Sequence, residues 1–345
     1  MNRPPDHPLV PHGRVGVLFI NLGSPDAPTP AAVRPYLRQF LSDPRVVELP
    51  PLIWKPLLNA FVLQTRPQKT AEAYAAIWDR DANDSPLRAI TRAQTRAVAE
   101  WLEGRALVDF AMRYGEPSIP ARLKALREAG CDRLLLAPLY PQYSSATTGT
   151  ALEEVFRVLC AERWMPAIRT LPPYHDHPAH IAALARSTRA MLEALPFEPQ
   201  RLVMSFHGMP VATLAKGDPY HCQCRKTARL LGEALGMSDR VEVTFQSRFG
   251  PAEWLQPYTE PRLLELAKEG VQRVAILCPG FSADCLETLE EIAIEARDAF
   301  LAAGGTDYAY LPCLNASVEG IAMLEALLAQ ELSGWVELEG VLAPV

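Results

Sequence analysis

The fold of this chain is decided by two similar segments, Arg14-Val-Gly-Val-Leu-Phe-Ile-Asn-Leu-Gly-Ser-Pro25 and Arg201-Leu-Val-Met-Ser-Phe-His-Gly-Met-Pro210. Each is an apolar run that ends near glycine and proline, which is typical of a buried parallel strand leading into a loop. The two segments lie in different halves of the 345-residue sequence. Their likeness indicates an internal duplication, so we expect both halves to form the same arrangement of strands and helices.

Further pairs of similar segments follow in the same order in both halves. Phe110-Ala-Met-Arg-Tyr-Gly115 resembles Phe245-Gln-Ser-Arg-Phe-Gly250, and Leu171-Pro172 resembles Leu311-Pro312. The predicted strands are 15–22, 106–112, 133–139, 166–171, 201–207, 241–246, 272–278 and 306–311. The predicted helices include 30–41, 86–103, 118–129, 221–236, 259–269 and 285–303.

Strands that alternate with helices at this spacing predict parallel sheets with right-handed crossovers. The sequence therefore predicts an α/β fold with two similar Rossmann-like domains, each a four-stranded parallel sheet flanked by helices. The predicted domains are residues 12–170 and 171–312, and residues 313–345 carry a last helix that packs back on the first domain. Because open α/β sheets bind ligands at the carboxyl ends of their strands, we expect the site in the cleft between the domains.

Composition and charge exclude several classes of function. The net charge is −6 and the pI is about 5.7, so we expect no nucleic-acid partner. Residues 1–13 lack the charged-then-apolar pattern of a signal peptide, which predicts a cytoplasmic protein. Seven scattered cysteines indicate reduced thiols rather than a disulfide framework. Cys222 and Cys224 form a close pair, which is a weak metal signal without a second pair.

A histidine and a row of acids follow predicted strands of the second half. His207 ends its strand beside Gly208, and it is either a hydrogen-bonded structural residue or a catalyst. A helix from residue 284 would place five acids on one face: Asp284, Glu287, Glu291, Glu295 and Asp298. We interpret the last two as a solvated face. Asp284 and Glu287 lie in the first turn, where they could pass a divalent cation or protons, and Glu291 is intermediate.

Other polar and aromatic residues also follow predicted strands. Arg113 beside Tyr114, and Arg248 near Trp254, are either an anion-binding and ring-stacking set or surface arginines beside packed rings. The hydroxyl-rich loop 141–149 precedes a helix start that suits anions. Since the chain has no Gly-x-Gly-x-x-Gly and no P-loop, nucleotide binding is disfavoured.

Three histidines and one apolar segment stand apart from the strand ends. The histidines, in a loop that enters a helix, have metal-like spacing, and we expect them on a solvated surface with weak metal affinity at most: His175, His177 and His180. The segment 49–63 is rich in apolar residues and bounded by proline. As a loop it predicts a hydrophobic lip for an apolar ligand or a membrane surface, the alternative being core packing.

Several motifs together resemble the ferrochelatase family, whose members insert ferrous iron into protoporphyrin IX. The resemblance runs from about residue 15 to about residue 317. The motifs are Asn21-Leu-Gly-Ser-Pro25, Pro138-Leu-Tyr-Pro-Gln-Tyr-Ser144, Ser205-Phe-His-Gly208, Gly217-Asp-Pro-Tyr220 and Pro279-Gly-Phe-Ser-Ala-Asp-Cys-Leu-Glu-Thr-Leu-Glu290. The resemblance implies a lyase that forms protohaem and releases two protons in the terminal step of haem biosynthesis, with Fe²⁺ as substrate and no required cofactor.

The same resemblance implies the roles of individual residues. His207 is the active-site histidine and Glu287 the carboxylate across the cleft, and both are implied to bind the metal together with Asp284 and Glu291. The residues implied to contact the porphyrin are Leu22, Arg113, Tyr114, Tyr143, Ser144, Trp254 and Phe281. The start of the helix predicted at 285–303 departs from the family, because Cys285 stands where many relatives carry histidine. Leu22 likewise stands where relatives carry methionine or tyrosine, so no axial ligand is expected there.

The resemblance leaves alternatives for cofactor and function. Some relatives bind a [2Fe-2S] cluster through cysteines of a C-terminal extension, and residues 340–345 contain none. We therefore expect no cluster, with Cys222 and Cys224 as the alternative ligands. Within enzymes, the alternative is a chelatase for coproporphyrin III or sirohydrochlorin. Outside enzymes, it is a non-catalytic tetrapyrrole carrier. Segment 49–63 adds the expectation of peripheral contact with the inner face of the membrane.

Overall fold

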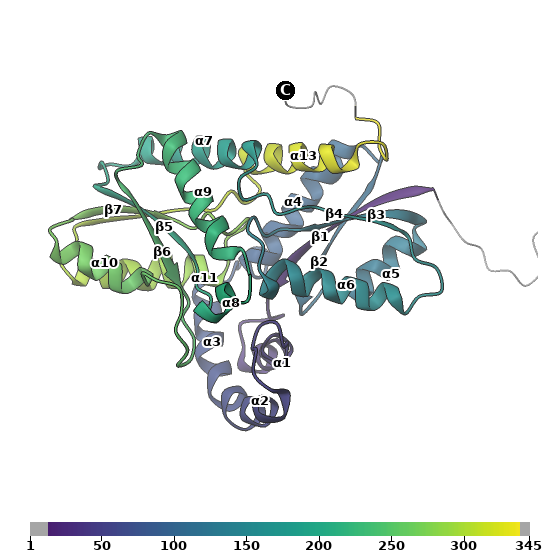
Figure 1. The fold of residues 1–345 in the computed structure, drawn as a ribbon, viewed down its shortest axis with the longest axis horizontal. Coiled ribbons are helices and arrows are strands. Elements are labelled where there is room, and N and C mark those ends of the chain that lie inside the picture. The colour runs from purple at the N-terminus through teal and green to yellow at the C-terminus, as the bar shows by residue number, and fades with distance from the viewer. Residues whose placement is uncertain (1–12, 339–345) are drawn as a thin grey trace, which may run out of the picture.

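The computed structural model describes residues 13–338, which form two lobes side by side (Figure 1). The first lobe contains a parallel sheet of β1 (Arg14–Gly23), β2 (Leu107–Tyr114), β3 (Cys131–Pro138) and β4 (Ala167–Thr170) in the order β2-β1-β3-β4. Residues 1–12 lie outside the described residues, and they include most of the segment without a signal pattern and the first residue of the predicted first domain. Residues 339–345, the end of the predicted C-terminal segment, also lie outside them. Among residues 13–338, no helix is long and apolar enough to span a bilayer.

The second lobe repeats the arrangement of the first. Its parallel sheet contains β5 (Arg201–His207), β6 (Val241–Gln246), β7 (Arg273–Leu277) and β8 (Asp307–Leu311) in the order β6-β5-β7-β8. Counted within each half, the strand order is the same as in the first sheet, as a duplicated sequence requires. The predicted fold class is confirmed, and all eight strands lie within a few residues of their predicted bounds.

Strand β1 shows why these segments are buried on both faces. Val15, Val17 and Phe19 point to one side of the sheet, and Leu18 and Ile20 point to the other. Alternating side chains of a strand point to opposite faces, so a continuous apolar run needs helices on both sides. On one side these are α5 (Ile119–Glu128) and α6 (Thr150–Cys160). The equivalent layer of the second lobe contains α10 (Thr259–Lys268) and α12 (Arg297–Ala302).

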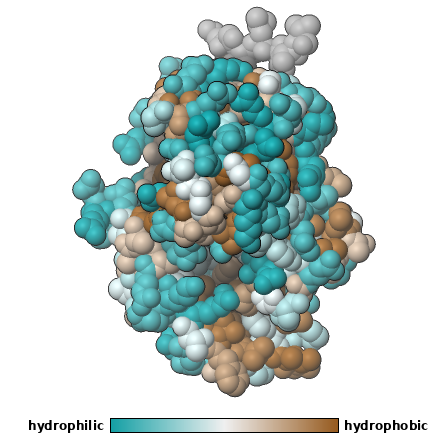
Figure 2. Space-filling view, turned by 90° about the vertical axis from the view of Figure 1, so that its left-hand side faces the viewer, coloured by the Kyte–Doolittle hydropathy of each residue, from teal (hydrophilic) through white to brown (hydrophobic). Residues whose placement is uncertain are grey.

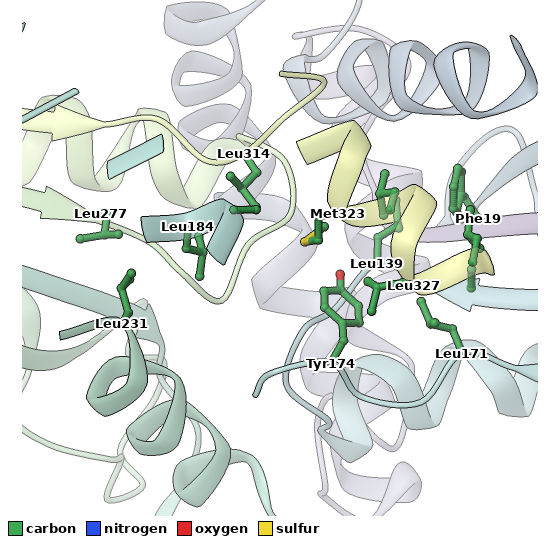
Figure 3. Packing of buried hydrophobic residues seen from close by; sticks show 14 of the residues in the cluster. Phe19, Leu139, Leu171, Tyr174, Leu184, Leu231, Leu277, Leu314, Met323 and Leu327 are labelled. Carbon is green, nitrogen blue, oxygen red and sulfur yellow. The ribbon is translucent and has the colours of Figure 1, made fainter. Parts of the chain in front are cut away.

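The opposite layer is shared between the two lobes. Helix α4 (Pro86–Leu102) lies on the first sheet and α9 (Tyr220–Leu235) on the second. Helix α7 (Pro178–Ala194), which ends the first half, packs against α9, and α13 (Val318–Leu332), which ends the second half, packs against α4 (Figure 1). A single apolar core runs beneath these helices from one lobe to the other, with Met323 between Leu184 and Leu327 (Figure 3).

The segment predicted as an apolar loop is helical, which corrects that expectation. After α1 (Pro30–Leu41), the segment folds into α2 (Pro51–Leu57) and η1 (Leu58–Val62). Helix α3 (Leu63–Ile77) follows directly. Proline does not prevent this, because Pro51 occupies the first turn, where its missing N–H has no partner to lose. Trp54 and Leu58 are buried, whereas five apolar side chains of this region are exposed: Leu49, Leu52, Ile53, Leu57 and Phe61. They lie at the lower end of the molecule, where apolar surface gathers (Figure 2).

The predicted helix 285–303 is present, but it is not one regular α-helix. It consists of α11 (Leu286–Leu289), the π-helix η3 (Glu291–Ala296) and α12. One turn of a π-helix holds more residues than one turn of an α-helix, so η3 changes the direction in which all later side chains of the helix point. The single acidic face predicted at α-helical spacing is therefore broken. The first half has a π-turn at the equivalent place, η2 (Ser145–Gly149), before α6.

The three histidines expected on a solvated surface are not equally exposed, and the expectation is wrong for His180. This side chain is 2% exposed at the start of α7, where its ring packs edge-on against Tyr174 with 5.3 Å between ring centroids. His177 instead caps α7, because its Nδ1 accepts the N–H of Ala179. His180 lies within α7, one helical turn before the buried Leu184, and this place on the apolar face of the helix was the available signal in the sequence.

His180 predicts that stability falls in acid. Burial lowers the pKa of His180 from its ordinary 6.5 to about 4. The unfolded chain therefore binds a proton between those pH values while the folded chain does not, so the stabilising contribution is complete above pH 6.5 and is lost as the pH falls to about 4. The full loss is on the order of 3 kcal/mol. In His180→Phe, urea unfolding should lose this part of the pH dependence, and an unchanged slope would contradict the assignment.

Candidate active site at the strand ends

His207 ends β5 with one ring nitrogen free. Its Nδ1 lies 2.6 Å from the carbonyl oxygen of Gly208. Because a carbonyl oxygen only accepts hydrogen bonds, Nδ1 carries the proton, and Nε2 keeps its lone pair. The side chain is half-buried, so Nε2 can reach a ligand. An imidazole held in this way is suited to accept a proton or bind a cation.

Gly208 allows close packing directly after His207. A Cβ atom at this position would lie 2.6 Å from the carbonyl oxygen of Gln246 and 3.2 Å from the ring of Trp254. Any larger residue would move the chain away from β6. The ring of Trp254 therefore lies beside the strand end that carries His207. Trp254 is one of the residues predicted to contact the porphyrin. Its indole Nε1 is buried and has no hydrogen-bond partner among the described residues.

Gln246 connects the strand end of His207 to the helix that carries the acids. It is the neighbour of His207 across the β5–β6 ladder. Its side-chain Nε2 donates to the main-chain oxygen of Glu287 at 2.6 Å, and its Oε1 accepts from Ser205 at 2.7 Å. The side chain is buried, so these bonds fix the start of α11 against the end of β5. The sequence analysis missed Gln246; its place at the end of a strand was the available signal.

Glu287 lies in the first turn of α11 and faces helices of the first lobe. Burial raises the pKa of the Tyr36 hydroxyl on α1, and the negative charge of Glu287 raises it further. The same carboxylate contributes to the raised pKa of Tyr74 on α3, after burial and the Tyr36 hydroxyl. Helix α11 also packs against α3, so Glu287 lies where the two lobes meet. His207 and Glu287, predicted from separate segments, are thus brought to neighbouring elements.

Glu291 is held by the residue that follows β6. The N–H of Ser247 donates to one carboxylate oxygen of Glu291 at 2.6 Å, and the Ser247 hydroxyl donates to the other. Burial raises the pKa of Glu291, while these two bonds and the charge of His207 oppose the rise. Ser247 has φ 61°, which few residues other than glycine adopt, so the two bonds hold a strained backbone. Both His207 and Glu287 act electrostatically on Glu291, so the three groups lie near one another.

Glu290 is a further acid that the sequence analysis did not single out. Burial, together with the nearby charge of Glu295, raises the pKa of Glu290 to about 7. Lys69 on α3 lowers it in part. A carboxyl group that titrates near neutral pH can exchange protons with solvent under ordinary conditions. It lies beside Glu291, so the acidic side of η3 offers two carboxyl groups with raised pKa values.

Asp284 lies in a different environment from Glu287. Its carboxylate is buried and accepts hydrogen bonds from Tyr310, from the side-chain amide of Asn315 at 2.6 Å and from Thr288 at 3.0 Å. Its own N–H donates to the side chain of Asn315 at 2.8 Å. These partners join α11 to the segment after β8. The bonds occupy the carboxylate within the second lobe.

A preformed metal cage is absent from the described part of the chain. Among residues 13–338, no group of three or more histidine, cysteine, aspartate or glutamate side chains is arranged to hold a metal ion. The acids near His207 form a row along α11 and η3 rather than a closed set. Cys285 is buried, and burial raises the pKa of its thiol well above the ordinary value.

Arg113 and Tyr114 are bound to Asp43 rather than free. The guanidinium of Arg113 donates to Asp43 at 2.6 Å and to the Thr150 hydroxyl at 2.8 Å, and the Tyr114 hydroxyl donates to Asp43 at 2.8 Å. Burial opposes ionisation of Asp43, but hydrogen bonds from Thr150, Arg45 and Tyr114 and the charge of Arg113 outweigh it and lower its pKa. Arg113 lines a groove of about 490 Å³ on the first lobe, and neither His207 nor Glu287 lines it.

Two predicted porphyrin contacts meet at the junction of the lobes. Leu22, at the end of β1, and Phe281, in the loop after β7, pack on the same small apolar cluster as Cys285. Leu22 also packs on the cluster formed by α1, α2 and α3. The next residue, Gly23, has φ 111°, and a Cβ there would lie 1.8 Å from the Tyr114 carbonyl oxygen, so glycine is required. These side chains give the junction an apolar wall.

Tyr143 and Ser144, the last two predicted contacts, lie in a loop bonded to the second lobe. The N–H of Tyr143 donates to the side chain of Gln223 on α9 at 2.7 Å. The Ser144 side chain is fully buried, and its hydroxyl donates to Asp218 at 3.1 Å. This loop therefore belongs to the contact between the lobes.

Arg66 on α3 is a candidate that the sequence analysis missed. Its guanidinium stacks on the ring of Phe249, 4.2 Å from the ring centroid. Arg66 makes no ion pair with any residue in the range 13–338, and burial lowers its pKa. Phe249 follows Ser247 and packs on the same apolar cluster as Leu22. An exposed, stacked and unpaired guanidinium at this junction is suited to bind a carboxylate ligand.

Comparison with known proteins identifies close sequence relatives. The family model described as Ferrochelatase matches residues 14–332. The ferrochelatase of Rhizobium meliloti (strain 1021) is 53% identical over 334 residues, which cover 96% of this chain and 98% of that protein. The ferrochelatase of Azoarcus sp. (strain BH72) is 52% identical over 326 residues, which cover 94% of this chain and 89% of that protein.

Comparison with solved structures supports the fold. SirB from Bacillus subtilis with Fe³⁺ matches with a TM-score of 0.55 and 15% identity, over 93% of this chain and 98% of that chain. The sirohydrochlorin chelatase SirB from Bacillus subtilis subspecies spizizenii in complex with cobalt matches with a TM-score of 0.53 and 11% identity, over 93% and 97%. At this identity the likeness extends to the fold alone.

Proposed function

Because this chain belongs to the ferrochelatase family, we propose that it inserts Fe²⁺ into protoporphyrin IX, releases two protons and forms protohaem. The chain is a ferro-lyase by family, and the resemblance predicted from its motifs is confirmed. The observation that carries the proposal is the placement of His207 and Glu287. Gln246 bonds the helix start of Glu287 to the strand end of His207, where the lobes meet.

The proposed reaction requires bases in an apolar site. Each of two pyrrole nitrogens loses a proton as the metal enters, so groups must accept two protons on the face of the macrocycle. His207 has a free Nε2 to accept the first, because its Nδ1 donates to Gly208. We assign the second to Glu287. Glu291 and Glu290, whose pKa values are raised, then pass protons outward along η3.

We further propose that Fe²⁺, the metal substrate, binds transiently to Glu287, Glu291 and His207 before it enters the porphyrin. Carboxylate and imidazole groups are ordinary ligands of ferrous iron. The proposal gives Asp284 a different role from the one implied by the resemblance. Its carboxylate already accepts bonds from Tyr310, Asn315 and Thr288, so we assign it to support of α11. The apolar wall at Leu22 would hold the macrocycle in a shape nearer the transition state.

The decisive experiment is anaerobic insertion of Fe²⁺ into protoporphyrin IX by the purified protein, followed by loss of porphyrin fluorescence. Coproporphyrin III and sirohydrochlorin serve as competing substrates in the same assay. Preference for either would replace the assigned substrate. Tight binding of protoporphyrin or haem without insertion of Fe²⁺ or Zn²⁺ would instead identify a tetrapyrrole carrier.

Arg66→Ala should raise the KM for protoporphyrin IX about tenfold, because it removes a charge-assisted bond to a propionate. The measurement is steady-state insertion at varied porphyrin concentration. Arg66→Lys keeps the charge and loses the stacking on Phe249, so its KM should fall between that of the native protein and that of Arg66→Ala. Protoporphyrin dimethyl ester lacks the carboxylates and tests the assignment further. The assignment fails if Arg66→Ala weakens binding of the ester as much as binding of the acid.

We propose that the exposed apolar side chains of α2 form a lip that contacts a membrane surface. Leu52 is 91% exposed and Ile53 67% exposed. Transfer of two such side chains from water is worth about 1.5–3 kcal/mol each, which gives a weak, reversible contact. Leu52→Glu combined with Ile53→Glu should reduce co-sedimentation with phosphatidylglycerol-containing vesicles at least tenfold. Val318→Glu, an 82% exposed residue of α13, is the matched control. Equal loss in the control would contradict the lip.

We propose that the enzyme works without a [2Fe-2S] cluster. Cys222 is exposed and Cys224 is buried on α9, so their sulfur atoms do not face the same surroundings. Burial raises the pKa of the Cys224 thiol, which disfavours the thiolate that a cluster needs.

A further inference from the structure

The motif Gly217-Asp-Pro-Tyr220 has no part in the chemistry above, yet its aspartate joins the two lobes. One carboxylate oxygen of Asp218, Oδ1, accepts the N–H of Tyr220 at 3.0 Å. The other, Oδ2, accepts the N–H of Ser145 at 2.8 Å and the hydroxyl of Ser144 at 3.1 Å. One side chain therefore binds the start of α9 in the second lobe and the start of η2 in the first.

Both helix starts favour a negative charge. The first N–H groups of a helix have no partner within the helix, and its N-terminal end carries a partial positive charge. Tyr220 begins α9, a helix of 16 residues, and Ser145 begins η2, which continues into α6. A shared carboxylate satisfies N–H groups of both helices at once. Charge-assisted hydrogen bonds of this kind are shorter and stronger than neutral ones.

Two further bonds extend the contact along α9. The Tyr143 N–H donates to Gln223, and the Gln142 side chain donates to the Thr227 hydroxyl at 3.0 Å. We call this set of contacts the α9 seam; its members are Gln142, Tyr143, Ser144, Ser145, Asp218, Gln223 and Thr227. The loop of the first lobe is thus bonded to successive turns of α9. Asp218 supplies the negative charge of the α9 seam.

The α9 seam also fixes the segment that begins at His207. Residues 208–219 lead from this histidine to α9 and include α8 (Val211–Ala215). Near His207 the segment is held by main-chain bonds, from Leu255 to Met209 and from Val211 to Glu253, each at 2.9 Å. At its far end it is held by Asp218. The Gly208 carbonyl, which orients the imidazole, stands at the beginning of this segment.

We propose that Asp218 is a positioning residue, which keeps the segment after His207 and the loop of Tyr143 in a fixed relation and so preorganises the porphyrin site across the lobes. The inference rests on the proposed function and deepens it. Asp218 does not touch the reacting atoms in this assignment. Its loss should therefore weaken binding of the macrocycle more than it slows insertion once the macrocycle is bound.

The test compares Asp218→Ala with Asp218→Asn, which keeps one acceptor oxygen. We expect Asp218→Ala to raise the porphyrin KM and the fluorescence-measured Kd about tenfold, while kcat per active site changes less than about threefold. Asp218→Asn should lie between this variant and the native protein. Asp239→Ala, an exposed acid on the loop after α9, is the matched control and should leave KM unchanged.

A second pair of variants removes the other end of the bond. Ser145→Pro deletes the N–H that Asp218 accepts, at a helix start where proline is tolerated. Ser145→Ala keeps that N–H and loses only the hydroxyl contacted by Arg45. We expect Ser145→Pro, and not Ser145→Ala, to raise the KM, and its effect should not add to that of Asp218→Ala.

Several results would overturn the inference. The first such result is that Asp218→Ala lowers only the melting temperature and leaves KM and kcat per active site unchanged. Asp218 would then only cap the start of α9. The second is that the effects of Ser145→Pro and Asp218→Ala are fully additive. If Asp218→Ala does not fold, the Ser145 pair decides alone. Failure of the proposed function is separate, because it appears as absent insertion by the native protein, whereas these variants are also compared by porphyrin binding without iron.

Discussion

His207→Ala should reduce iron insertion by a factor of about 10²–10⁴ while leaving porphyrin affinity within a few-fold of the native value. The imidazole is the proposed base of the site, because its Nδ1 donates a hydrogen bond to the Gly208 carbonyl and its Nε2 is free. Removing it leaves a pyrrole proton without its acceptor. In the proposed site the macrocycle would be held by apolar side chains such as Leu22, whose cluster does not include this ring.

The measurement combines anaerobic insertion kinetics with fluorescence titration of porphyrin. His221→Ala is the matched control, because His221 stacks on Phe245 from α9 at 5.8 Å and has no place in the mechanism. Glu287→Gln should also slow insertion, because it removes the proposed acceptor of the second pyrrole proton. Near-native turnover of His207→Ala would remove the basis of the proposed mechanism.

Asp284→Ala should have the largest effect on stability, a loss of about 3–5 kcal/mol in the free energy of unfolding. The carboxylate is 5% exposed and accepts hydrogen bonds from Tyr310, Asn315 and Thr288. Its removal leaves buried donors without an acceptor and opens a cavity between α11 and the segment after β8. Each unsatisfied buried group costs about 1–3 kcal/mol.

Urea unfolding at neutral pH measures this loss, with Asp298→Ala on the exposed side of α12 as the control. Asp284→Asn keeps the shape and part of the hydrogen bonding, so it should recover much of the stability. The opposite outcome is informative about iron. If Asp284→Ala folds with native stability but requires far higher Fe²⁺ concentrations, Asp284 is a metal ligand as the family resemblance implies, and its structural assignment is wrong.

The strands could be predicted from the sequence because their signal is local and occurs twice. An apolar run such as 201–207 followed by glycine indicates a buried strand by itself, and its similarity to the run at residue 14 confirms the reading. The position of His207 at a strand end followed directly. The position of Glu287 in the first turn of the helix after β7 could be predicted in the same way.

Other features could not be predicted because they depend on distant contacts. Asp284 and Glu287 look alike in the sequence, yet one faces Tyr310 and Asn315, which lie 26 and 31 residues further along the chain. The π-turn η3 also escapes a prediction that assumes 100° per residue. The prolines of segment 49–63 favour a loop in the sequence, although Pro51 fits the first turn of α2 and Pro56 lies inside that helix.

The exchange of α7 and α13 has a consequence for how such a chain could have arisen. Each half ends in a helix that packs against a helix of the other half, α7 against α9 and α13 against α4. A polypeptide with a single half would expose the apolar surface that the exchanged helix covers, and two copies could cover it by trading terminal helices, as in a swapped homodimer. Gene fusion would then join two subunits that were already interlocked. On this view, an isolated half of the present protein should recover its fold only in the company of the other.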